Sequence, residues 1–363
     1  MTEHKDDRIS IEDLRRQIDQ IDQNILKLIN QRLMLAQQIG NLKGLNGAPV
    51  LDPDREARLM KSLCDANKGP LKTEELRHIF SEIIAAARRV QRPIQIAFLG
   101  PEATFTHLAA LKHFGHLNEF VPQENIYEIF SQVERGKCHY GVVPVENSIE
   151  GAVNHTLDLL FESTVSICGE IYSPISHALL CKNGRPEDIR EIFSHPQALA
   201  QCRRWLDRHL PDAVIKTCES TGYAARMAAE RPDAGAIASC EAAQIYGLQV
   251  AAWAIEDSSR NTTRFIMIGK DAPAPTANDK TSIMLVTAHR PGALYHALQP
   301  IADAGINMVK LESRPTKQQN WSYFFFVELD GHQQDPPVRT AIDQMRSLCL
   351  YLKILGSYPK AQG

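Results

Sequence analysis

The chain has 363 residues, which is enough for two or three domains with buried cores of their own. Its 40 lysines and arginines nearly balance its 43 aspartates and glutamates, so the charge gives no argument for binding nucleic acid or an anionic membrane. The polar stretch from Met1 to Arg8 lacks a signal-peptide core, and nothing approaches the roughly 18 continuous apolar residues of a membrane span. Scattered cysteines with no C-x-x-C pair are typical of free thiols, so we expect a soluble cytoplasmic protein without a metal.

Residues up to about 92 predict an all-helical segment. Ser10 and Asp13 have the spacing of a capping box at the start of a long first helix, which we expect to run to about Lys43. A glycine-containing break follows, Asp52 is typical of the cap of a second helix, and a third helix begins near Thr73.

The first helix carries an apolar seam with alternating spacings of three and four, as in a helix packed against another helix. Its members are Ile11, Leu14, Ile18, Ile21, Ile25, Leu28, Leu35, Ile39 and Leu42. Arg32 occupies a seam position, where a guanidinium is unfavourable unless a fixed anion meets it, although alone it could also reach solvent or a glutamate. Arg15 and Arg32 are about 25 Å apart along the helix, so a small ligand touching both requires an antiparallel second copy. Lys43 is about 16 Å from Arg32, close enough for their long side chains to converge.

These residues match, in order and spacing, the active-site set of the all-helical chorismate mutases, which the segment therefore resembles. The set is Arg15, Arg32, Lys43, Asp52, Arg55, Glu56 and Gln91. The resemblance implies rearrangement of chorismate to prephenate without a covalent intermediate, by holding the diacid in its reactive form and stabilising charge on the ether oxygen.

The resemblance also implies roles. Arg32 and the Arg15 of a second copy would bind the substrate carboxylates. Lys43 and Gln91 would donate to the ether oxygen, and Glu56 would bind the ring hydroxyl.

Three further positions complete this expected site. Asp52 and Arg55 would bind substrate, although Asp52 also fits a plain helix cap. Ala87 stands where the family often carries a serine that bonds a substrate carboxylate. Losing one such bond costs about 1–3 kcal/mol at most, so we expect reduced affinity and retained activity.

Arg92-Pro93 marks a boundary, after which short strands alternate with helices as in α/β domains. Expected strands include Ile94–Leu99, Tyr140–Val145, Val214–Cys218 and Phe265–Ile268. Polar strings stand at strand ends, where open α/β sheets bind ligands, and the first four run into expected helix starts. They are GPEATF from Gly100, ENS from Glu146, HPQ from His195, ESTG from Glu219 and NTTRF from Asn261. Any one string is typical of a turn or cap, but together they predict a site for a small acidic ligand.

The longer strings IAFLGPEATF, YGVVPVENS, FSHPQALAQC and NTTRF resemble those of prephenate dehydratases, and the resemblance covers residues 93 to 271. It implies two α/β lobes closing over a cleft, like a periplasmic binding protein, and loss of water and CO2 from prephenate to give phenylpyruvate. Aromatisation drives this reaction, so no cofactor is expected.

The family role of proton donor to the leaving ring hydroxyl would fall to Thr263. The substrate-orienting residues would be Thr104, Asn147, Ser148, Gln197, Ser220, Thr221, Arg264 and Phe265. Ala103 departs from a glycine of the family, which is tolerable where its φ is negative.

Asp271–Asp279 is expected to be a linker, and the pattern after it, βαββαβ, is that of a ferredoxin-like domain. Two strings, from Arg290 and from Glu312, resemble those of phenylalanine-binding ACT domains. The resemblance implies an L-phenylalanine site between paired ACT domains, at Gly292, Ala293, Leu294, Glu312, Ser313 and Arg314. An oligomerisation domain without a ligand is the alternative.

The chain as a whole resembles the bifunctional chorismate mutase–prephenate dehydratases. The expected domains are a helical mutase at 1–92, a two-lobed α/β dehydratase at 93–271 and an α+β ACT domain at 280–363. The expected enzyme acts on chorismate and prephenate, is inhibited by L-phenylalanine, and forms a homodimer or larger homo-oligomer. No dinucleotide or P-loop string follows a strand, which argues against a mutase–dehydrogenase fusion. A non-catalytic amino-acid sensor stays an alternative, although a sensor has no need of Arg32, Lys43 and Thr263.

Overall fold

The computed structural model of the chain describes residues 10–46, 53–91, 94–258, 260–315 and 323–361. The side chains of Lys43 and Gln91, and the whole of Asp52, lie outside the described residues. The described part forms two units: a helical one with residues 10–46 and 60–91, and a larger one with residues 53–59 and all the described strands. Among these residues no helix combines the length and the apolarity needed to cross a bilayer.

The N-terminal segment has the three expected helices in the expected order. They are α1 (Ile11–Asn46), α2 (Pro53–Ala66) and α3 (Thr73–Gln91). The capping box is present, because Ser10 Oγ accepts from Asp13 N (3.1 Å) and Asp13 Oδ2 accepts from Ser10 N (3.2 Å). α1 packs on α3 only over part of its length, where Ala36 and Ile84 are buried.

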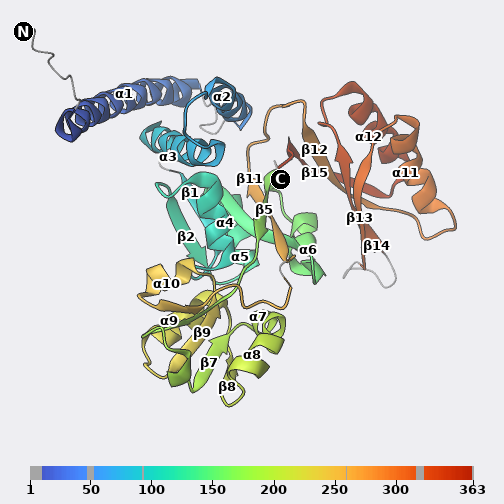
Figure 1. Cartoon of the computed structure of the whole chain (residues 1–363). Helices are drawn as coiled ribbons and strands as arrows, with labels where there is room; N and C mark the ends of the chain where they lie inside the picture. Colours follow the sequence, from blue (N-terminus) through green and yellow to red (C-terminus); the bar gives the residue numbers. More distant parts are fainter. Residues whose placement is uncertain (1–9, 47–52, 92–93, 259, 316–322, 362–363) are drawn as a thin grey trace, which may run out of the picture. The chain divides into compact units, whose positions relative to one another are not determined.

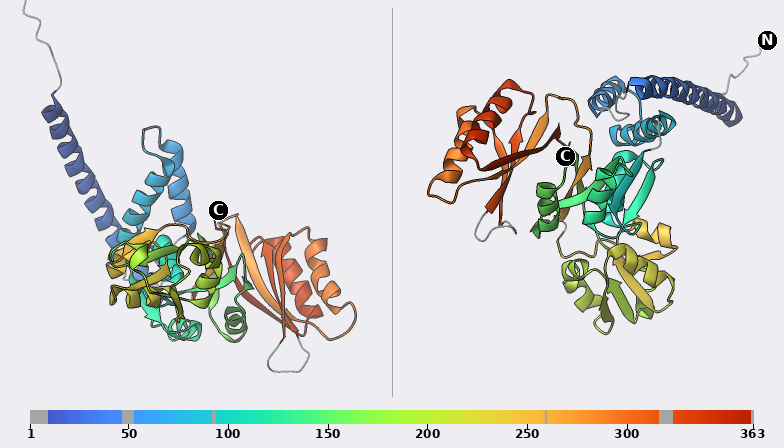
Figure 2. Two further views of the ribbon diagram at one scale, coloured as in Figure 1. Left: turned by 60° about the horizontal axis from the view of Figure 1, so that its bottom comes forward. Right: turned by 180° about the vertical axis from the view of Figure 1, so that it is seen from behind.

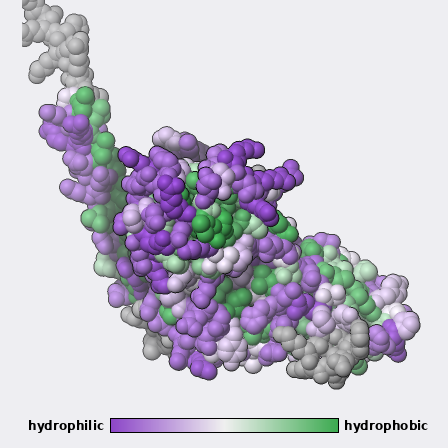
Figure 3. Space-filling view, turned by 90° about the horizontal axis from the view of Figure 1, so that it is seen from below, coloured by the Kyte–Doolittle hydropathy of each residue, from purple (hydrophilic) through white to green (hydrophobic). Residues whose placement is uncertain are grey.

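Most of the apolar seam of α1 is open to solvent. Its side chains from Ile11 to Leu28, together with Leu35 and Leu42, are each 48–70% exposed. Figure 3 shows apolar residues of α1 on the surface, in green. A seam of this length on a single described chain is typical of a surface that another protein surface covers.

The first lobe of the larger unit is a mixed sheet with strand order β2-β1-β3-β11-β5. Its elements are β1 (Gln95–Leu99), α4 (Phe105–Phe114), β2 (Glu119–Gln123), α5 (Ile126–Glu134), β3 (Tyr140–Asn147), β4 (Gly151–Ala152), α6 (Asn154–Glu162), β5 (Ser166–Pro174) and β11 (Thr262–Gly269). β1 runs parallel to β2 and β3, whereas β11 is antiparallel to both of its neighbours. The last strand in sequence therefore lies inside the sheet.

The second lobe is formed between β5 and β11, by residues 175–261. Its elements are β6 (Ala178–Cys181), a 3-10 turn (Pro186–Asp188), β7 (Glu191–Ser194), α7 (Pro196–Gln201), α8 (Arg203–His209), β8 (Val214–Thr217), α9 (Thr221–Ala229), β9 (Ala234–Ala238), α10 (Glu241–Tyr246) and β10 (Gln249–Ala252). The sheet order is β10-β6-β9-β7-β8. Alanines of α9 and α10 pack on one face and α7 with α8 on the other, so the expected two-lobed α/β fold is confirmed.

The C-terminal domain has the expected βαββαβ order. It consists of β12 (Asp279–Val286), α11 (Ala293–Asp303), β13 (Met308–Pro315), β14 (Tyr323–Asp330), α12 (Pro336–Leu348) and β15 (Tyr351–Pro359). The sheet order is β13-β14-β12-β15, and Figures 1 and 2 show α11 and α12 side by side against this sheet. Their apolar residues and one face of the sheet form a separate core.

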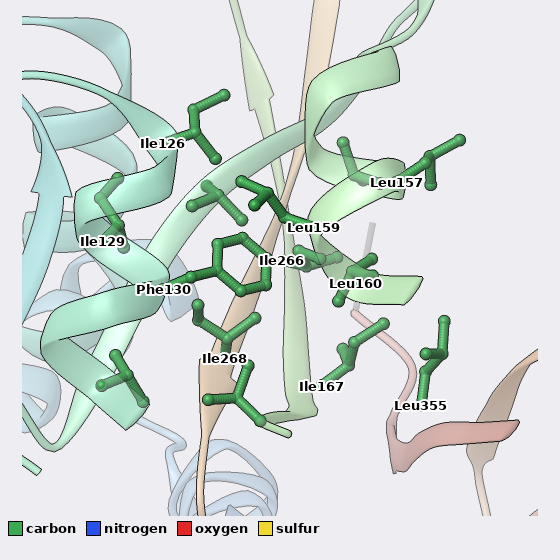
Figure 4. Close-up of a cluster of buried hydrophobic side chains, with 14 of the residues drawn as sticks. Ile126, Ile129, Phe130, Leu157, Leu159, Leu160, Ile167, Ile266, Ile268 and Leu355 are labelled. Atoms are coloured by element: carbon green, nitrogen blue, oxygen red, sulfur yellow. The ribbon is translucent and has the colours of Figure 1, made fainter. Parts of the chain in front are cut away.

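The other face of the C-terminal sheet is buried against the first lobe. Met284, Phe326 and Leu355 belong to the same apolar core as residues of α5, α6 and β5. In Figure 4, Leu355 lies beside Ile167 of β5 and Leu160 of α6. The C-terminal domain and the first lobe therefore share one hydrophobic core.

Candidate active site

A cleft of about 1000 Å³ is lined by both lobes of the α/β domain. Each of the polar strings identified in the sequence contributes to its lining. Among the predicted site residues, those that line it are Thr104, Asn147, Gln197, Ser220, Thr221, Thr263 and Phe265. The polar strings at strand ends therefore line one cleft, and the binding of a small acidic ligand there stays a prediction.

Helix caps place several of these side chains. Thr104 Oγ1 accepts from His107 N (3.3 Å) at the start of α4 and donates to Leu99 O (2.8 Å). Ser220 Oγ accepts from Tyr223 N (3.1 Å) at the start of α9. These hydroxyls fix the helix starts at the cleft, where free N–H groups favour an anionic ligand.

The side chain of Asn147 is not positioned by a helix cap, because the turn after it leads into β4 and not directly into a helix. Its Oδ1 accepts from Ile149 N (3.0 Å) and Glu150 N (3.2 Å). Its Nδ2 donates to Asn261 Oδ1 (2.8 Å) and to Thr263 Oγ1 (2.9 Å). The amide thereby orients the Thr263 hydroxyl at the start of β11.

A chain of hydrogen bonds extends from Thr263 into the second lobe. Asn261 Nδ2 donates to Gln201 Oε1 (2.7 Å), and His177 Nε2 donates to the same oxygen (3.0 Å). Burial lowers the pKa of His177 more than its bond to Gln201 raises it, so the imidazole is neutral at neutral pH. Gln201, Asn261 and His177 line the cleft but were missed as single residues, although two of them stand inside the quoted strings.

Arg226 is another lining residue that the sequence did not single out. It projects from α9 and its guanidinium lies 4.8 Å from the ring centroid of Tyr223. Among the described residues that line the cleft, it is the one with a permanent positive charge. It is placed to meet a carboxylate at this end of the cleft.

Two predicted residues lie away from the cleft lining. Ser148 Oγ donates to Arg260 O (3.1 Å) and accepts from Thr262 N (2.9 Å), which ties the turn after β3 to the start of β11. Arg264 is buried on the opposite side of β11, where Nη1 and Nη2 donate to Glu328 (2.9 and 2.6 Å) and Nε donates to Glu170 (2.8 Å). The expectation that Arg264 orients substrate is corrected, because adjacent residues of a strand face opposite sides.

Ala103 does not meet the condition of a negative φ under which an alanine is tolerable at this family glycine. Its φ is +63°, a left-handed conformation that costs an alanine about 1–3 kcal/mol. The residue is fully buried, its N–H donates to His107 Nδ1 (3.1 Å), and its carbonyl accepts from Ser239 Oγ (3.3 Å). These bonds, with burial of a methyl worth about 0.8 kcal/mol, offset part of the strain.

In the helical unit, Arg32 is half-buried and Nη1 donates to Ile83 O of α3 (3.3 Å). Ala87 is buried in α3, and Arg15 is exposed on α1. On α2, Arg55 is exposed and Glu56 is half-buried. The sequence-predicted residues therefore occupy helices as expected, and Lys43, Asp52 and Gln91 fall outside the described side chains.

The predicted regulatory residues fall on α11 and β13. Gly292 has a φ of +77° and caps α11, which begins with Ala293 and Leu294. Glu312, Ser313 and Arg314 lie on β13, at the edge of the C-terminal sheet. Arg314 Nη2 already donates to Asp158 Oδ1 of α6 (3.0 Å), so this arginine reaches the first lobe.

Within the described ranges, no group of three or more His, Cys, Asp or Glu side chains is arranged to hold a metal ion.

Comparison with known proteins matches every part of the chain. The family models for chorismate mutase type II, prephenate dehydratase and the ACT domain match residues 14–92, 96–273 and 281–346. A bifunctional chorismate mutase/prephenate dehydratase of Aquifex aeolicus is 44% identical and covers 97% of this chain and 98% of its own.

Solved structures match about three quarters of the chain. A prephenate dehydratase from Arthrobacter aurescens in complex with L-Phe is 34% identical, with a TM-score of 0.68 over 73% of this chain and 90% of that one. A quorum-quenching acylase is 30% identical, with a TM-score of 0.68 over 74% of this chain and 98% of that one. Because this fold serves more than one chemistry, the family assignment depends on the relatives that match along the whole chain. The chain belongs to the family of bifunctional chorismate mutase/prephenate dehydratases.

Proposed function

We propose that Thr263 is the proton donor of the dehydratase reaction and that Asn147 prepares it. The observation that carries this proposal is the hydrogen bond from Asn147 Nδ2 to Thr263 Oγ1 (2.9 Å) at the cleft wall. A hydroxyl that accepts from an amide keeps its own hydrogen free to donate. That hydrogen is then available to the ring hydroxyl of prephenate.

The bond changes follow from this placement. The ring hydroxyl takes a proton as its C–O bond breaks and leaves as water. The bond from the ring to the carboxylate breaks at the same time, and its electron pair enters the ring as CO2 departs. Thr263 donates through a hydrogen bond in the transition state, as its high intrinsic pKa requires, and regains a proton from water.

The two carboxylates of prephenate need partners in the same cleft. Arg226 supplies a positive charge, and the N-terminus of α9 at Thr221 supplies free N–H groups. Gln197 and Phe265, which also line the cleft, would orient the substrate.

The test is prephenate turnover by Thr263→Ala and Thr263→Ser. Loss of the donor should lower kcat about 10²- to 10⁴-fold, and serine should restore much of it. Chorismate mutase activity of the same preparations is the internal control. A Thr263→Ala protein with full turnover would contradict the assignment.

For the mutase we propose a site shared between two copies of the chain. The exposed seam of α1 would pair with an antiparallel second α1, which brings Arg15 of one copy to Arg32 of the other. By family resemblance, Arg15 and Arg32 bind the carboxylates. The remaining proposed site residues are Lys43, Asp52, Arg55, Glu56, Ala87 and Gln91.

Mixing two inactive variants tests this arrangement. Arg15→Ala and Arg32→Ala homo-oligomers should both lack mutase activity. After refolding together, each mixed dimer should regain one intact site. If both arginines serve the same site from one chain, the mixture stays inactive.

We also propose that the ACT domain binds L-phenylalanine and inhibits the dehydratase. The supporting observations are the strings at Gly292 and Glu312 and the related dehydratase solved with L-Phe. Dehydratase rates in saturating L-phenylalanine should fall while mutase rates hold. Unchanged rates would favour an ACT domain that serves oligomerisation alone.

We place the enzyme in the cytoplasm, since each of its eight cysteines, all among the described residues, is a free thiol. The functional limits we propose for its domains are residues 1–92, 93–271 and 280–363.

A further inference from the structure

The cleft side chains and the buried charges of the α/β domain lie on opposite sides of the same two strands. In the register of β11 against β3, Thr263 pairs with Asn147 and Arg264 pairs with Glu146. Adjacent residues of a strand point to opposite faces. Thr263 and Asn147 therefore face the cleft, while Arg264 and Glu146 face the ACT sheet.

Side chains of the ACT domain form ion pairs with both Arg264 and Glu146. Glu328 of β14 accepts both ends of the Arg264 guanidinium, from Nη1 (2.9 Å) and Nη2 (2.6 Å). Lys310 of β13 lies 2.6 Å from Glu146 Oε2, as a close ion pair without the alignment of a hydrogen bond. Lys310 and Glu328 are paired with each other across the ACT sheet.

A wider charge cluster surrounds these pairs. It consists of Glu146, Glu170, Arg264, Lys280, Lys310 and Glu328, with equal numbers of positive and negative groups among these described residues. The side chains of Arg264, Glu170 and Glu328 are 4%, 2% and 2% exposed. In such a desolvated cluster, removal of one charge leaves its partner uncompensated and buried. The positions of the charged groups are therefore coupled to one another.

The same ACT strand carries the proposed regulatory string. Lys310 stands two residues before Glu312 on β13, and Arg314 of that string donates to Asp158 of the first lobe. A shift of β13 on ligand binding would therefore move ion pairs that end beside Asn147 and Thr263.

We propose that Glu328 and Lys310 of the ACT domain are positioning residues of the dehydratase, which set the register of β11 against β3 where Thr263 meets Asn147. Through the charge cluster they transmit the state of β13 to the proton donor. This inference rests on the proposed role of Thr263. It places the regulatory contact on the back of the catalytic strand pair, outside the cleft.

The test compares Glu328→Gln and Lys310→Met with wild type in the full-length protein. Misplacement of the Thr263 hydroxyl should lower dehydratase kcat roughly 10- to 100-fold with little change in KM. Inhibition by L-phenylalanine should weaken in the same variants. Mutase activity should stay at the wild-type rate.

Asp330→Asn is the matched control. Asp330 lies on β14 two residues after Glu328, and its ion pair with Lys360 Nζ (2.7 Å) stays inside the ACT domain. Its loss should leave dehydratase kcat and the response to L-phenylalanine unchanged. Glu328→Asp, which keeps the charge, should recover part of the lost kcat.

The outcomes separate this inference from the function it rests on. If wild type turns over prephenate only with Thr263 intact, yet both variants keep wild-type kcat and inhibition, the inference is wrong and the proposed function stands. A variant that merely unfolds at lower temperature, with normal kcat in its folded fraction, also overturns it. If Glu328→Gln does not fold, Lys310→Met, whose side chain is more accessible at 11% exposed, decides the matter by the same readouts.

Discussion

Replacement of Asn147 with aspartate changes the hydrogen-bonding direction at the catalytic hydroxyl while keeping the side-chain shape. The two backbone donors to Oδ1 keep their acceptor and gain a charged partner. The Nδ2 of Asn147, which donates to Asn261 and Thr263, is replaced by a carboxylate oxygen, which can only accept. The side-chain amide of Asn261 cannot rotate by half a turn to present its Nδ2 to the new carboxylate, because that Nδ2 donates to Gln201 (2.7 Å).

The structure gives the expected magnitudes. The bond to Thr263 reverses its direction, but the bond to Asn261 is lost and leaves two acceptors facing each other, which costs about 1–3 kcal/mol. The strengthened backbone bonds offset part of this cost, so the free energy of unfolding should fall by about 1–2 kcal/mol. The catalytic loss is larger. The new carboxylate draws the Thr263 hydrogen toward itself and away from substrate, so kcat should fall about 10²- to 10⁴-fold.

The assay is phenylpyruvate formation from prephenate, with mutase activity as the control for folding. Asn125→Asp is the matched variant, because Asn125 also lines the cleft and its cap at α5 needs only the retained Oδ1. It adds the same charge to the cleft without touching Thr263. It should therefore raise KM and leave kcat nearly unchanged. If Asn147→Asp behaves in the same way, the orientation of the Thr263 hydroxyl is not what Asn147 provides.

Three other predictions concern the cleft cation, the ACT contact and the buried glutamate. Arg226→Gln should raise the KM for prephenate about tenfold or more with kcat little changed, whereas loss of kcat alone would contradict a carboxylate-binding role. Gly356→Ala should destabilise the protein by about 3 kcal/mol in thermal or urea unfolding, because its Cβ would lie 2.2 Å from Ile167 O; Gly305→Ala, with only positive-φ strain, should lose about 1 kcal/mol. Burial alone would raise the pKa of Glu328, but the positive charge of Arg264 outweighs burial, and the pKa lies below its usual 4.5. The ionised Glu328 therefore stabilises the fold above pH 4.5, and this stabilisation is lost as the pH falls. The unfolding midpoint of wild type should accordingly drop more steeply in acid than that of Glu328→Gln, and parallel curves would refute this.

The sequence predicted the elements well because their signals are local. The capping box at Ser10, the strand-end strings and the βαββαβ pattern each depend on residues that are neighbours in the chain. Within each lobe the polar strings gather for the same reason, since the carboxyl ends of parallel strands of one sheet meet at one edge. Local pattern was therefore sufficient for the elements and for polar strings at strand ends, whereas the two lobes and the roles of single residues were expected from the family resemblance.

The features that the sequence did not predict depend on contacts between distant segments. Arg264 was expected to orient substrate because of the family resemblance, but its partner Glu328 stands 64 residues later on another sheet. Ala103, with its positive φ, accepts a hydrogen bond from Ser239, 136 residues away, in addition to its local bond with His107. Gln201 takes its role from Asn261, 60 residues away.

The place of β11 in its sheet has a consequence for synthesis on the ribosome. β3 and β5 are not neighbours in the first sheet, because β11 lies between them and is made after the entire second lobe. A nascent chain that ends before residue 262 therefore holds two strands with unpaired inner edges, which are prone to pair with other chains. The second lobe, by contrast, has all its strands within residues 175–261 and can fold as it emerges. The first lobe must wait for its central strand, so the cleft is completed only when the segment that carries Thr263 arrives.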